Sequence, residues 1–318
     1  MIIVCITPLK HLEGLYKKLT TFGKVYYEPE INYKNLKKIL NKNKKIDTIF
    51  CNPNKQNYKI DLSLLKNSGV KLINTASTGL NHIDMAACKK LNIQVISLKD
   101  DRKLLKKLPS TSEVAFCLMI NLLKNFDKSF KSVQKFNWNY EPFIGRELAS
   151  LTVGIIGYGR LGKFMSKFCT GFDMKIKIYD PFVKAKKFSN TSLLNIFKSC
   201  DIISLHVHAD KFTKYMINYK LLSSAKKKPI IINTSRGEIV LEKDIIRALK
   251  KNIISGYGCD VVEHEFGNLK ISPIINNIIN YNIIVTPHIG GMSIEGQKRA
   301  WIHAIEKFEN KKLLNLSK

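Results

Sequence analysis

Three residues whose types suit acid–base chemistry each follow an apolar run in the second half of the chain. Arg236 lies just beyond the run 229–233, and Glu265 and His288 lie beyond two later runs. An arginine can hold a substrate carboxylate, a histidine can exchange a proton with an alcohol or carbonyl oxygen, and a glutamate can hold that histidine. Taken singly, each has an ordinary alternative as a surface ion pair, a solvated carboxylate or a loop histidine. Their shared position after strands of one predicted sheet favours a common site.

A glycine-rich turn lies upstream of these residues. The apolar strand expected at residues 151–156 leads into Gly157, Gly159 and Gly162 in the spacing G-x-G-x-x-G, and a helical pattern follows. The first glycine permits a tight turn, the second lets a pyrophosphate approach the backbone, and the third allows close packing of helix on strand. The spacing alone is a weak signal, but its position between a strand and a helix predicts a dinucleotide site.

Asp180 ends the next predicted strand, close to the distance from the glycines at which an acidic residue binds the adenosine ribose. Its carboxylate can accept hydrogen bonds from the ribose hydroxyls and would repel a 2′-phosphate, so NAD is favoured over NADP. Lys184, Lys186 and Lys187 follow and could soften that repulsion, although we interpret them as a solvated loop.

Short apolar runs alternate with helical patterns through most of the chain. This alternation predicts an α/β fold with parallel sheets and covering helices. Between the two alternating series, Ser110 and Glu113 have the spacing of a capping box at the start of a long apolar helix. We expect strands at residues 2–6, 48–51, 72–76, 94–98, 151–156, 175–179, 202–207, 230–233, 256–261 and 283–286.

Composition narrows the class of protein. A length of 318 residues favours two domains. The net charge of +28 allows a nucleic-acid partner. We favour compositional drift with some attraction for anionic substrates, because the lysines form short scattered clusters without interleaved aromatics.

Seven scattered cysteines without a CxxC pair favour reduced thiols in a cytoplasmic protein. No apolar stretch approaches the roughly 18 residues of a membrane span, so no membrane partner is expected.

Several motifs occur in an order and spacing that resemble one family over nearly the whole chain. They resemble those of the D-isomer-specific 2-hydroxyacid dehydrogenases, most closely the phosphoglycerate dehydrogenase branch without its C-terminal regulatory domain. The motifs are ASTGLNHID (76–84), GREL (145–148), the glycine turn, DIISLHV (201–207), INTSRG (232–237), DVVEHE (260–265) and TPHIGG (286–291).

This resemblance implies two doubly wound parallel-sheet domains. A Rossmann NAD-binding domain at residues 102–287 would be inserted in a flavodoxin-like substrate domain made of residues 1–101 and 288–318. The implied enzyme moves a hydride between nicotinamide and C2 of a D-2-hydroxy acid or 2-keto acid, acting on a CH–OH group. Its substrate would be a small anionic acid, for example one like 3-phosphoglycerate. No metal is required, and the resemblance suggests a homodimer through the nucleotide domain.

The resemblance also implies roles for individual residues. Arg236 would bind the substrate carboxylate and polarise the carbonyl, His288 would be the acid and base, and Glu265 would be its carboxylate partner. Backbone groups around Ser77, Thr78 and Gly79 would close over the substrate. The residues that would bind the cofactor are Gly157, Gly159, Arg160, Leu161, Gly162, Asp180, His206, Thr234, Ser235 and Asp260.

The chain departs from the family pattern at two positions, and one rival function remains open. His208 and Phe266 stand where proline is common, and both could reshape the mouth of the site. Lys55 could meet a substrate phosphate, although a solvated lysine is the favoured interpretation. The rival is an NAD(H)-sensing regulatory or corepressor-like protein on the same fold, which the basic charge favours.

Overall fold

The computed structural model describes residues 1–53, 58–265 and 267–316, with side chains up to residue 311. The chain forms two compact units. Unit 1 comprises Met1–Leu108 and Met292–Lys318, and unit 2 comprises Pro109–Gly291. Lys55 and Phe266, which the sequence analysis singled out, lie outside the described residues.

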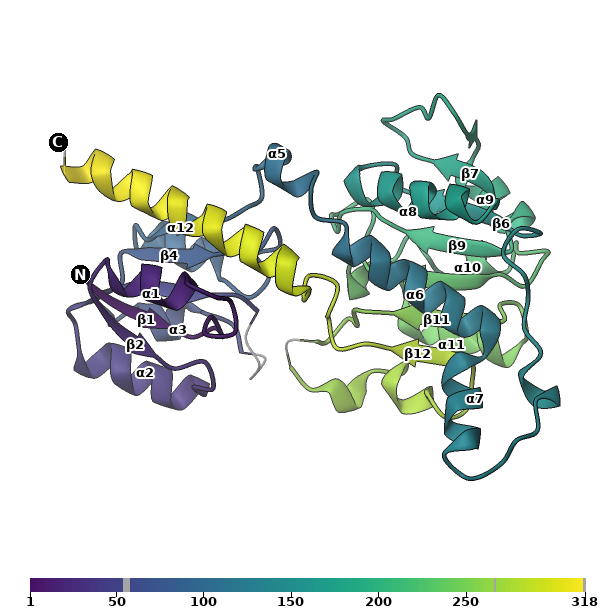
Figure 1. Cartoon of the computed structure of the whole chain (residues 1–318), viewed down its shortest axis with the longest axis horizontal. Coiled ribbons are helices and arrows are strands. Elements are labelled where there is room, and N and C mark those ends of the chain that lie inside the picture. The colour runs from purple at the N-terminus through teal and green to yellow at the C-terminus, as the bar shows by residue number, and fades with distance from the viewer. Residues whose placement is uncertain (54–57, 266, 317–318) are drawn as a thin grey trace. The chain divides into compact units, whose positions relative to one another are not determined.

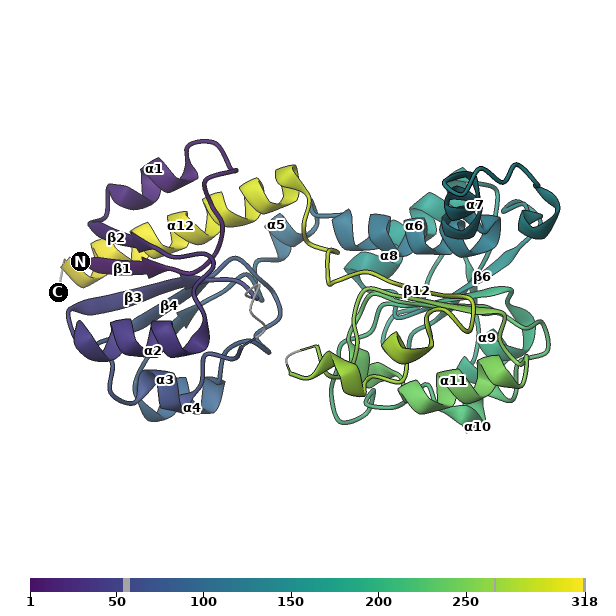
Figure 2. The ribbon, with the colours of Figure 1, turned by 90° about the horizontal axis from the view of Figure 1, so that it is seen from below.

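Unit 1 is built on a five-stranded parallel sheet in the order β2-β1-β3-β4-β5, which is the flavodoxin-like order. Helices cover both faces of this sheet: α1 and α12 on one, α2, α3 and α4 on the other (Figures 1 and 2). The strands are β1 (Ile2–Cys5), β2 (Lys24–Tyr27), β3 (Ile46–Cys51), β4 (Leu72–Thr75) and β5 (Gln94–Ile96). The helices are α1 (Leu15–Thr20), α2 (Tyr33–Lys42), α3 (Leu62–Leu65), α4 (Met85–Lys90), α5 (Arg102–Leu105) and α12 (Ile294–Leu316).

Two apolar layers hold unit 1 together. On the α12 face, the fully buried Trp301 stacks on Phe50 of the central strand β3, and Phe308 packs edge-on to the same ring. On the other face, Leu36 and Leu40 of α2 pack with β-branched strand residues. The C-terminal helix therefore forms part of the core of the N-terminal sheet, as the resemblance implied.

Unit 2 is built on a seven-stranded parallel sheet in the order β12-β11-β10-β9-β6-β7-β8. Its first six strands in chain order, β6 to β11, have the Rossmann arrangement, with the order reversing between β6 and β9. The strands are β6 (Thr152–Ile156), β7 (Lys175–Tyr179), β8 (Ser189–Asn190), β9 (Ile202–Leu205), β10 (Ile230–Asn233), β11 (Gly256–Cys259) and β12 (Ile283–Val285). The predicted fold class is confirmed.

Helices cover both faces of this sheet too: α6 and α8 on one, and α9, α10 and α11 on the other (Figure 2). The helices are α6 (Ser110–Lys124), α7 (Phe126–Val133), α8 (Arg160–Gly171), α9 (Leu193–Ser199), α10 (Tyr219–Leu222) and α11 (Glu242–Lys250). Short 3-10 turns lie at η1 (Glu141–Phe143), η2 (Gly237–Ile239), η3 (Leu269–Ile271) and η4 (Ile275–Asn277).

The predicted capping box at the start of α6 is wrong. Pro109 occupies the N-cap position, and no side chain caps the helix. The hydroxyls of the first turn make tertiary contacts instead: Ser112 Oγ donates to the carbonyl of Leu161 at 3.0 Å, and Thr111 Oγ1 donates to that of Gly290 at 3.1 Å. These bonds fasten α6 to the start of α8 and to the segment after β12.

The unit boundaries fall after Leu108 and Gly291, whereas the sequence analysis placed them after residues 101 and 287. The side-chain contacts explain both differences. Asp101, directly before α5, accepts a hydrogen bond from Lys307 of α12 at 2.8 Å, which keeps this segment with unit 1. The N–H of Gly290 donates to Asp260 at 2.7 Å, which keeps residues 288–291 with unit 2.

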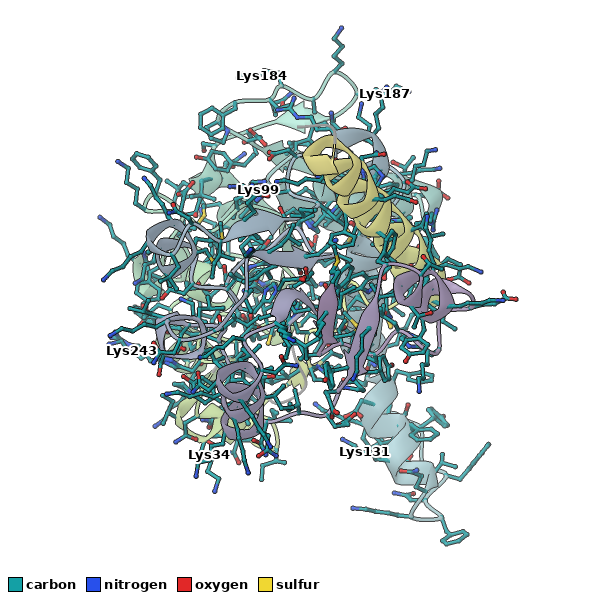
Figure 3. All side chains as sticks on the ribbon, turned by 90° about the vertical axis from the view of Figure 1, so that its left-hand side faces the viewer. Lys34, Lys99, Lys131, Lys184, Lys187 and Lys243 are labelled. Atoms are coloured by element: carbon teal, nitrogen blue, oxygen red, sulfur yellow. The ribbon has the colours of Figure 1, made fainter. Side chains whose placement is uncertain are left out.

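The basic residues are spread over both units. Of the six lysines labelled in Figure 3, two belong to unit 1 and four to unit 2, and only Lys184 and Lys187 share a loop. Among the described residues, no helix is long and apolar enough to cross a membrane. The cytoplasmic location remains a prediction.

Candidate active site

The glycine turn joins β6 to α8 at the point where the strand order of unit 2 reverses. Gly157 has a φ of +94°, and a Cβ on it would come within 2.7 Å of the His206 carbonyl oxygen. A Cβ on Gly162 would lie 2.1 Å from the Gly157 carbonyl, so both positions require glycine. Gly159 differs, because an added Cβ would meet no described atom within 4 Å. Its open face is what the close approach of a pyrophosphate requires.

Helix α8 begins directly after Gly159, without a side-chain cap and without an acidic residue in its first turn. The helix dipole favours an anion at this end of the helix. Arg160 and Leu161 form this first turn. Burial lowers the pKa of the Arg160 guanidinium, and the Leu161 carbonyl accepts the Ser112 hydroxyl.

Asp180 follows β7 and holds the glycine turn in place. One carboxylate oxygen accepts the N–H of Tyr158 at 2.7 Å, within the turn itself. The other accepts the N–H groups of Phe182 and Val183 at 2.8 and 2.9 Å. The predicted ribose carboxylate thus lies at the carboxyl end of β7, beside the glycine turn, and has a structural role in addition.

Two more of the predicted cofactor residues carry buried polar atoms for which the described structure offers no partner. These are Oγ1 of Thr234 and Nδ1 of His206. On the other side of its ring, His206 Nε2 lies 2.9 Å from Ser204 Oγ, and burial lowers the pKa of His206 to about 4. Unpaired buried polar atoms are costly, so their presence beside the glycine turn fits a polar ligand such as a dinucleotide.

Arg236 is held at the end of β10 by the side chain of Asn233 and the backbone of Ser235. The amide of Asn233 donates to the Arg236 carbonyl at 2.9 Å, and the guanidinium donates to the Ser235 carbonyl at 2.6 Å. Ser235 is buried and donates its hydroxyl to the carbonyl of Leu205 in β9. Arg236 is therefore attached to the carboxyl ends of β9 and β10.

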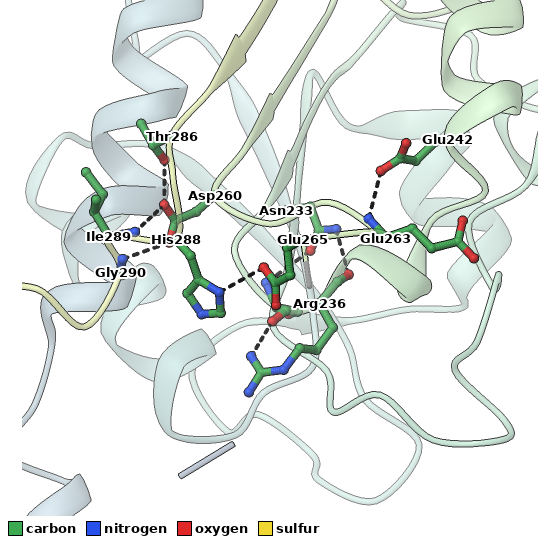
Figure 4. A network of polar contacts seen from close by, with 11 residues as sticks. Asn233, Arg236, Glu242, Asp260, Glu263, Glu265, Thr286, His288, Ile289 and Gly290 are labelled. Carbon is green, nitrogen blue, oxygen red and sulfur yellow. Dashed lines mark hydrogen bonds and ion pairs between the residues drawn. The ribbon is translucent and has the colours of Figure 1, made fainter. Parts of the chain in front are cut away.

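His288 and Glu265 form a hydrogen-bonded pair. Nδ1 of His288 lies 2.9 Å from Oε2 of Glu265, and the glutamate is the more buried partner. With Nδ1 engaged, Nε2 is the ring nitrogen left to exchange a proton with a bound molecule. Figure 4 shows both side chains and that of Arg236 pointing into the same region.

Asp260 fixes the backbone that carries His288. This carboxylate is 1% exposed and accepts the Thr286 hydroxyl, the Ile289 N–H and the Gly290 N–H (Figure 4). Burial raises the pKa of Asp260 despite these three donors. His288 itself has a φ of +55°, a left-handed conformation that is uncommon for a non-glycine residue.

The predicted substrate-binding residues Ser77, Thr78 and Gly79 lie in unit 1, after β4. The hydroxyl of Ser77 donates to the Gly79 carbonyl at 2.8 Å, and Thr75 Oγ1 lies 2.9 Å from Ser77 Oγ. Buried His82 contacts the same Thr75 hydroxyl through Nε2. These bonds shape a tight polar turn at the carboxyl end of the sheet, where ligands bind in such folds.

Comparison with known proteins places this geometry in a family. Residues 116–290 match the NAD binding domain of the D-isomer specific 2-hydroxyacid dehydrogenases, and residues 10–103 match the catalytic domain of the same family. The chain belongs to this family. Its second unit is an NAD-binding domain, and NAD as the cofactor is confirmed. Members of this family are oxidoreductases that act on the CH–OH group of donors, as the resemblance implied.

Individual relatives differ in their substrates and in their length. The hydroxypyruvate reductase of Thermotoga maritima is 31% identical over 243 residues, covering 75% of this chain and 76% of its own. The D-3-phosphoglycerate dehydrogenase of Bacillus subtilis is 29% identical over 238 residues, covering 73% of this chain but only 43% of that protein. A D-lactate dehydrogenase from Aquifex aeolicus, solved with NAD and lactic acid, is 27% identical with a TM-score of 0.78, covering 100% and 97% of the two chains.

The sequence did not predict several contacts that hold the candidate active site together. Asn233 and Thr286 lie inside the recognised motifs, but their contacts with the Arg236 carbonyl and with Asp260 were not foreseen. Glu242 lies outside those motifs, and it accepts the N–H of Glu263 near the His288–Glu265 pair (Figure 4). Its position at the start of an amphipathic helix is typical of a solvated residue, so local sequence offered no signal.

Proposed function

We propose that this chain interconverts a D-2-hydroxy acid and its 2-keto acid, with His288 as the acid and base and Glu265 as its partner. The 2.9 Å contact between His288 Nδ1 and Glu265 carries the proposal, because it orients the ring and leaves Nε2 for the substrate oxygen. The bound cofactor would supply the redox chemistry: NAD would take a hydride from C2 of the hydroxy acid, and NADH would give one to C2 of the keto acid. In the reducing direction the protonated imidazole donates to the carbonyl oxygen, and in the oxidising direction the neutral ring accepts the hydroxyl proton.

Arg236 is the proposed anchor for the substrate carboxylate. The Asn233 side chain holds its backbone, and its guanidinium already donates a hydrogen bond to the Ser235 carbonyl. The side chain therefore loses little conformational entropy when an acid binds. The same cation polarises the adjacent carbonyl. Backbone groups of Ser77, Thr78 and Gly79 are also proposed to bind the substrate.

The proposed cofactor site combines the glycine turn with the β9 and β10 edge of the same sheet. The N–H groups at the start of α8 would bind the pyrophosphate, and Asp180 would bind the adenosine ribose. The unpaired buried atoms of Thr234 and His206 support contact with the dinucleotide. The full proposed set is Gly157, Gly159, Arg160, Leu161, Gly162, Asp180, His206, Thr234, Ser235 and Asp260.

The proposed substrate is a short, polar, anionic acid such as hydroxypyruvate or the keto form of 3-phosphoglycerate. Relatives named for hydroxypyruvate and D-3-phosphoglycerate support this choice, and the net charge of +28 favours anions. The phosphate contact suggested for Lys55 lies outside the described residues.

One substrate panel tests the proposal. Purified protein and NADH are mixed with hydroxypyruvate, 3-phosphohydroxypyruvate, glyoxylate and pyruvate, and the loss of NADH absorbance is followed. We expect turnover with at least one acid, and a preference for the phosphorylated acid would assign the 3-phosphoglycerate-like substrate. Tight NADH binding with no turnover on any acid would refute the enzyme and favour the NAD(H)-sensing alternative.

We further propose that the protein is a homodimer through an aromatic arm of unit 2. This arm, residues 126–144, contains α7 and η1. Exposed apolar side chains are concentrated in it, and contiguous exposed apolar surface marks interaction sites. Phe136 and Trp138 are 100% and 85% exposed. The exposed apolar residues of the arm are Phe126, Phe130, Val133, Phe136, Trp138, Tyr140 and Ile144.

A further inference from the structure

Glu242 is a buried carboxylate that the proposed mechanism does not use. It is the first residue of α11, where a glutamate ordinarily faces solvent, yet it is only 3% exposed. One of its oxygens accepts the N–H of Glu263 at 2.9 Å, and the other accepts the hydroxyl of Ser272 at 2.7 Å. Burying a carboxylate is costly unless its oxygens are paired, so this position calls for an explanation.

The peptide that Glu242 holds lies between the two halves of the proposed catalytic machinery. On one side, Gly237 follows Arg236 and presses against this peptide: a Cβ on Gly237 would lie 2.1 Å from the Val262 carbonyl carbon and 2.2 Å from the Glu263 nitrogen. On the other side, the chain reaches Glu265 two residues later. The 262–263 peptide is thus clamped between the backbone beside Arg236 and the Glu242 carboxylate.

A second contact acts on the same segment. The hydroxyl of Tyr215 donates to the Glu263 carboxylate, and this hydrogen bond raises the pKa of Tyr215 to about 12, so the phenol remains a donor at neutral pH. Both the backbone and the side chain of Glu263 are therefore held from outside the motif. Figure 4 shows Glu242 and Glu263 on one flank of the network, with Glu265 and His288 further along it.

We propose that Glu242 is a positioning residue that sets the place of Glu265, and through it of His288, relative to Arg236. The inference rests on the proposed function of those three residues. Glu242 does not contact the proposed reacting groups, and its effect passes through the 262–263 peptide. A displacement of about 1 Å in a catalytic group can cost roughly 100-fold in rate, so a clamp at this peptide has kinetic consequences.

The test compares two substitutions of Glu242 in the full chain. Glu242→Met fills the same space but leaves the Glu263 N–H unpaired, whereas Glu242→Gln keeps an acceptor oxygen for it. We expect Glu242→Met to lower kcat for the best acid of the panel by about 10- to 100-fold, with NADH affinity changed less than about twofold. Glu242→Gln should restore kcat to within about threefold of the unsubstituted chain.

Asp201 provides the matched control, because it is also a buried carboxylate of unit 2 that holds a backbone N–H, that of Thr152. It precedes β9 and so lies at the amino end of the sheet, opposite the site. Asp201→Asn should lower the melting temperature without changing kcat per folded molecule. If Glu242→Met behaves in the same way, Glu242 is merely structural and the inference is overturned.

A readout without turnover separates this inference from the proposed function. The ring ¹⁵N signals of His288, assigned with His288→Gln, report its hydrogen bond to Glu265. They should move in Glu242→Met and stay in place in Glu242→Gln and Asp201→Asn. Unmoved signals in folded Glu242→Met would overturn the positioning role, whereas a chain inactive on every acid would overturn only the proposed function. If Glu242→Met does not fold, Ser272→Ala, which removes one donor, should show the same movement to a smaller extent, and its absence would count against the clamp.

Discussion

At the scale of single residues, the candidate site includes a histidine whose backbone is held in an uncommon left-handed conformation. His288 has a left-handed backbone and its N–H donates to the carbonyl of Thr286 two residues back. This tight turn is stabilised by the three hydrogen bonds that Asp260 accepts. Such strain is found where a side chain must be aimed, and here it presents the imidazole to Glu265.

Replacement of His288 tests its role as acid and base. His288→Ala should lower kcat by about 10²- to 10⁴-fold, because the imidazole is the proposed donor and acceptor of the proton. NADH affinity, measured by fluorescence titration, should change little. Glu265→Gln should give a smaller loss, since it weakens the partner and keeps the ring. Full activity in His288→Ala would show that another group moves the proton.

His206 makes a separate prediction about stability and pH. Its pKa in the folded chain is lowered to about 4, from about 6.5 in the unfolded chain, because burial disfavours the charged ring. The contribution of His206 to the free energy of unfolding is therefore fully present above pH 6.5. It is lost as the pH falls toward 4, because the unfolded chain binds a proton that the folded chain does not.

Removal of that histidine should make stability less dependent on pH. In His206→Gln, the free energy of unfolding from urea titration should fall less between pH 6.5 and 4 than in the unsubstituted chain, by up to about 1.4 kcal/mol per unit of pKa difference. His208→Gln, an exposed position two residues later, serves as the control and should leave the slope unchanged. Equal slopes in the two variants would refute the buried neutral ring.

At the scale of elements, the site is assembled where polar loops follow parallel strands. The turn after β6, Asp180 after β7, the motif after β10 and Asp260 after β11 all lie at the carboxyl edge of one sheet. Each loop is tied to its neighbour by a side chain accepting backbone N–H groups, as Asp180 does for Tyr158. Loops joined in this way hold a preformed site more firmly than isolated loops would.

The Asp180 contact predicts a double effect for one substitution. Asp180→Ala removes the ribose acceptor and also leaves the Tyr158 N–H of the glycine turn without its carboxylate. We expect NAD affinity to fall and the preference for NAD over NADP to narrow, because the repulsion toward a 2′-phosphate is lost. Asp180→Asn keeps an acceptor oxygen for the Tyr158 N–H. It should therefore reduce the preference for NAD over NADP with a smaller loss of NAD affinity than Asp180→Ala. An unchanged preference ratio in both variants would rule out the ribose role.

At the scale of the whole molecule, two properties bear on association: the aromatic arm of unit 2 and the net charge of +28. Burial of the arm against a second copy would remove aromatic surface from water, which favours a dimer. The like charge of two copies opposes their approach, and salt screens this repulsion. The two effects can be separated by ionic strength.

Sedimentation at low and high salt tests this balance. We expect a dimer that tightens as salt rises from about 50 mM to 500 mM, since screening weakens the repulsion while the aromatic contact remains. The double variant Phe136→Ser with Trp138→Ser should be a monomer under both conditions. Phe212→Ser, which removes another exposed aromatic of unit 2, should leave the dimer intact. A monomeric unsubstituted chain at all concentrations would refute the arm as an interface.

Local patterns in the sequence determined much of this protein. Apolar runs and their periodicity predicted most strands, because buried parallel strands have continuous apolar sequences. The edge strands β2 and β8 were missed, because β2 has four residues none of which is fully buried and β8 has two exposed polar residues. The glycine spacing, Asp180 and the residues after the later strands identified the family and the candidate site, because each is a short motif with its own chemistry.

Only the tertiary structure decided which groups hold those residues in place. Glu242 meets Glu263 across 21 positions of sequence, and Asp260 meets Gly290 across 30. The first-turn hydroxyls of α6 likewise bond to distant carbonyls instead of capping their own helix. Such pairings depend on how loops from different strands come together, and no local spacing encodes that. The proposed reacting groups could be recognised from their own motifs, but the residues that support them could be recognised only in the folded chain.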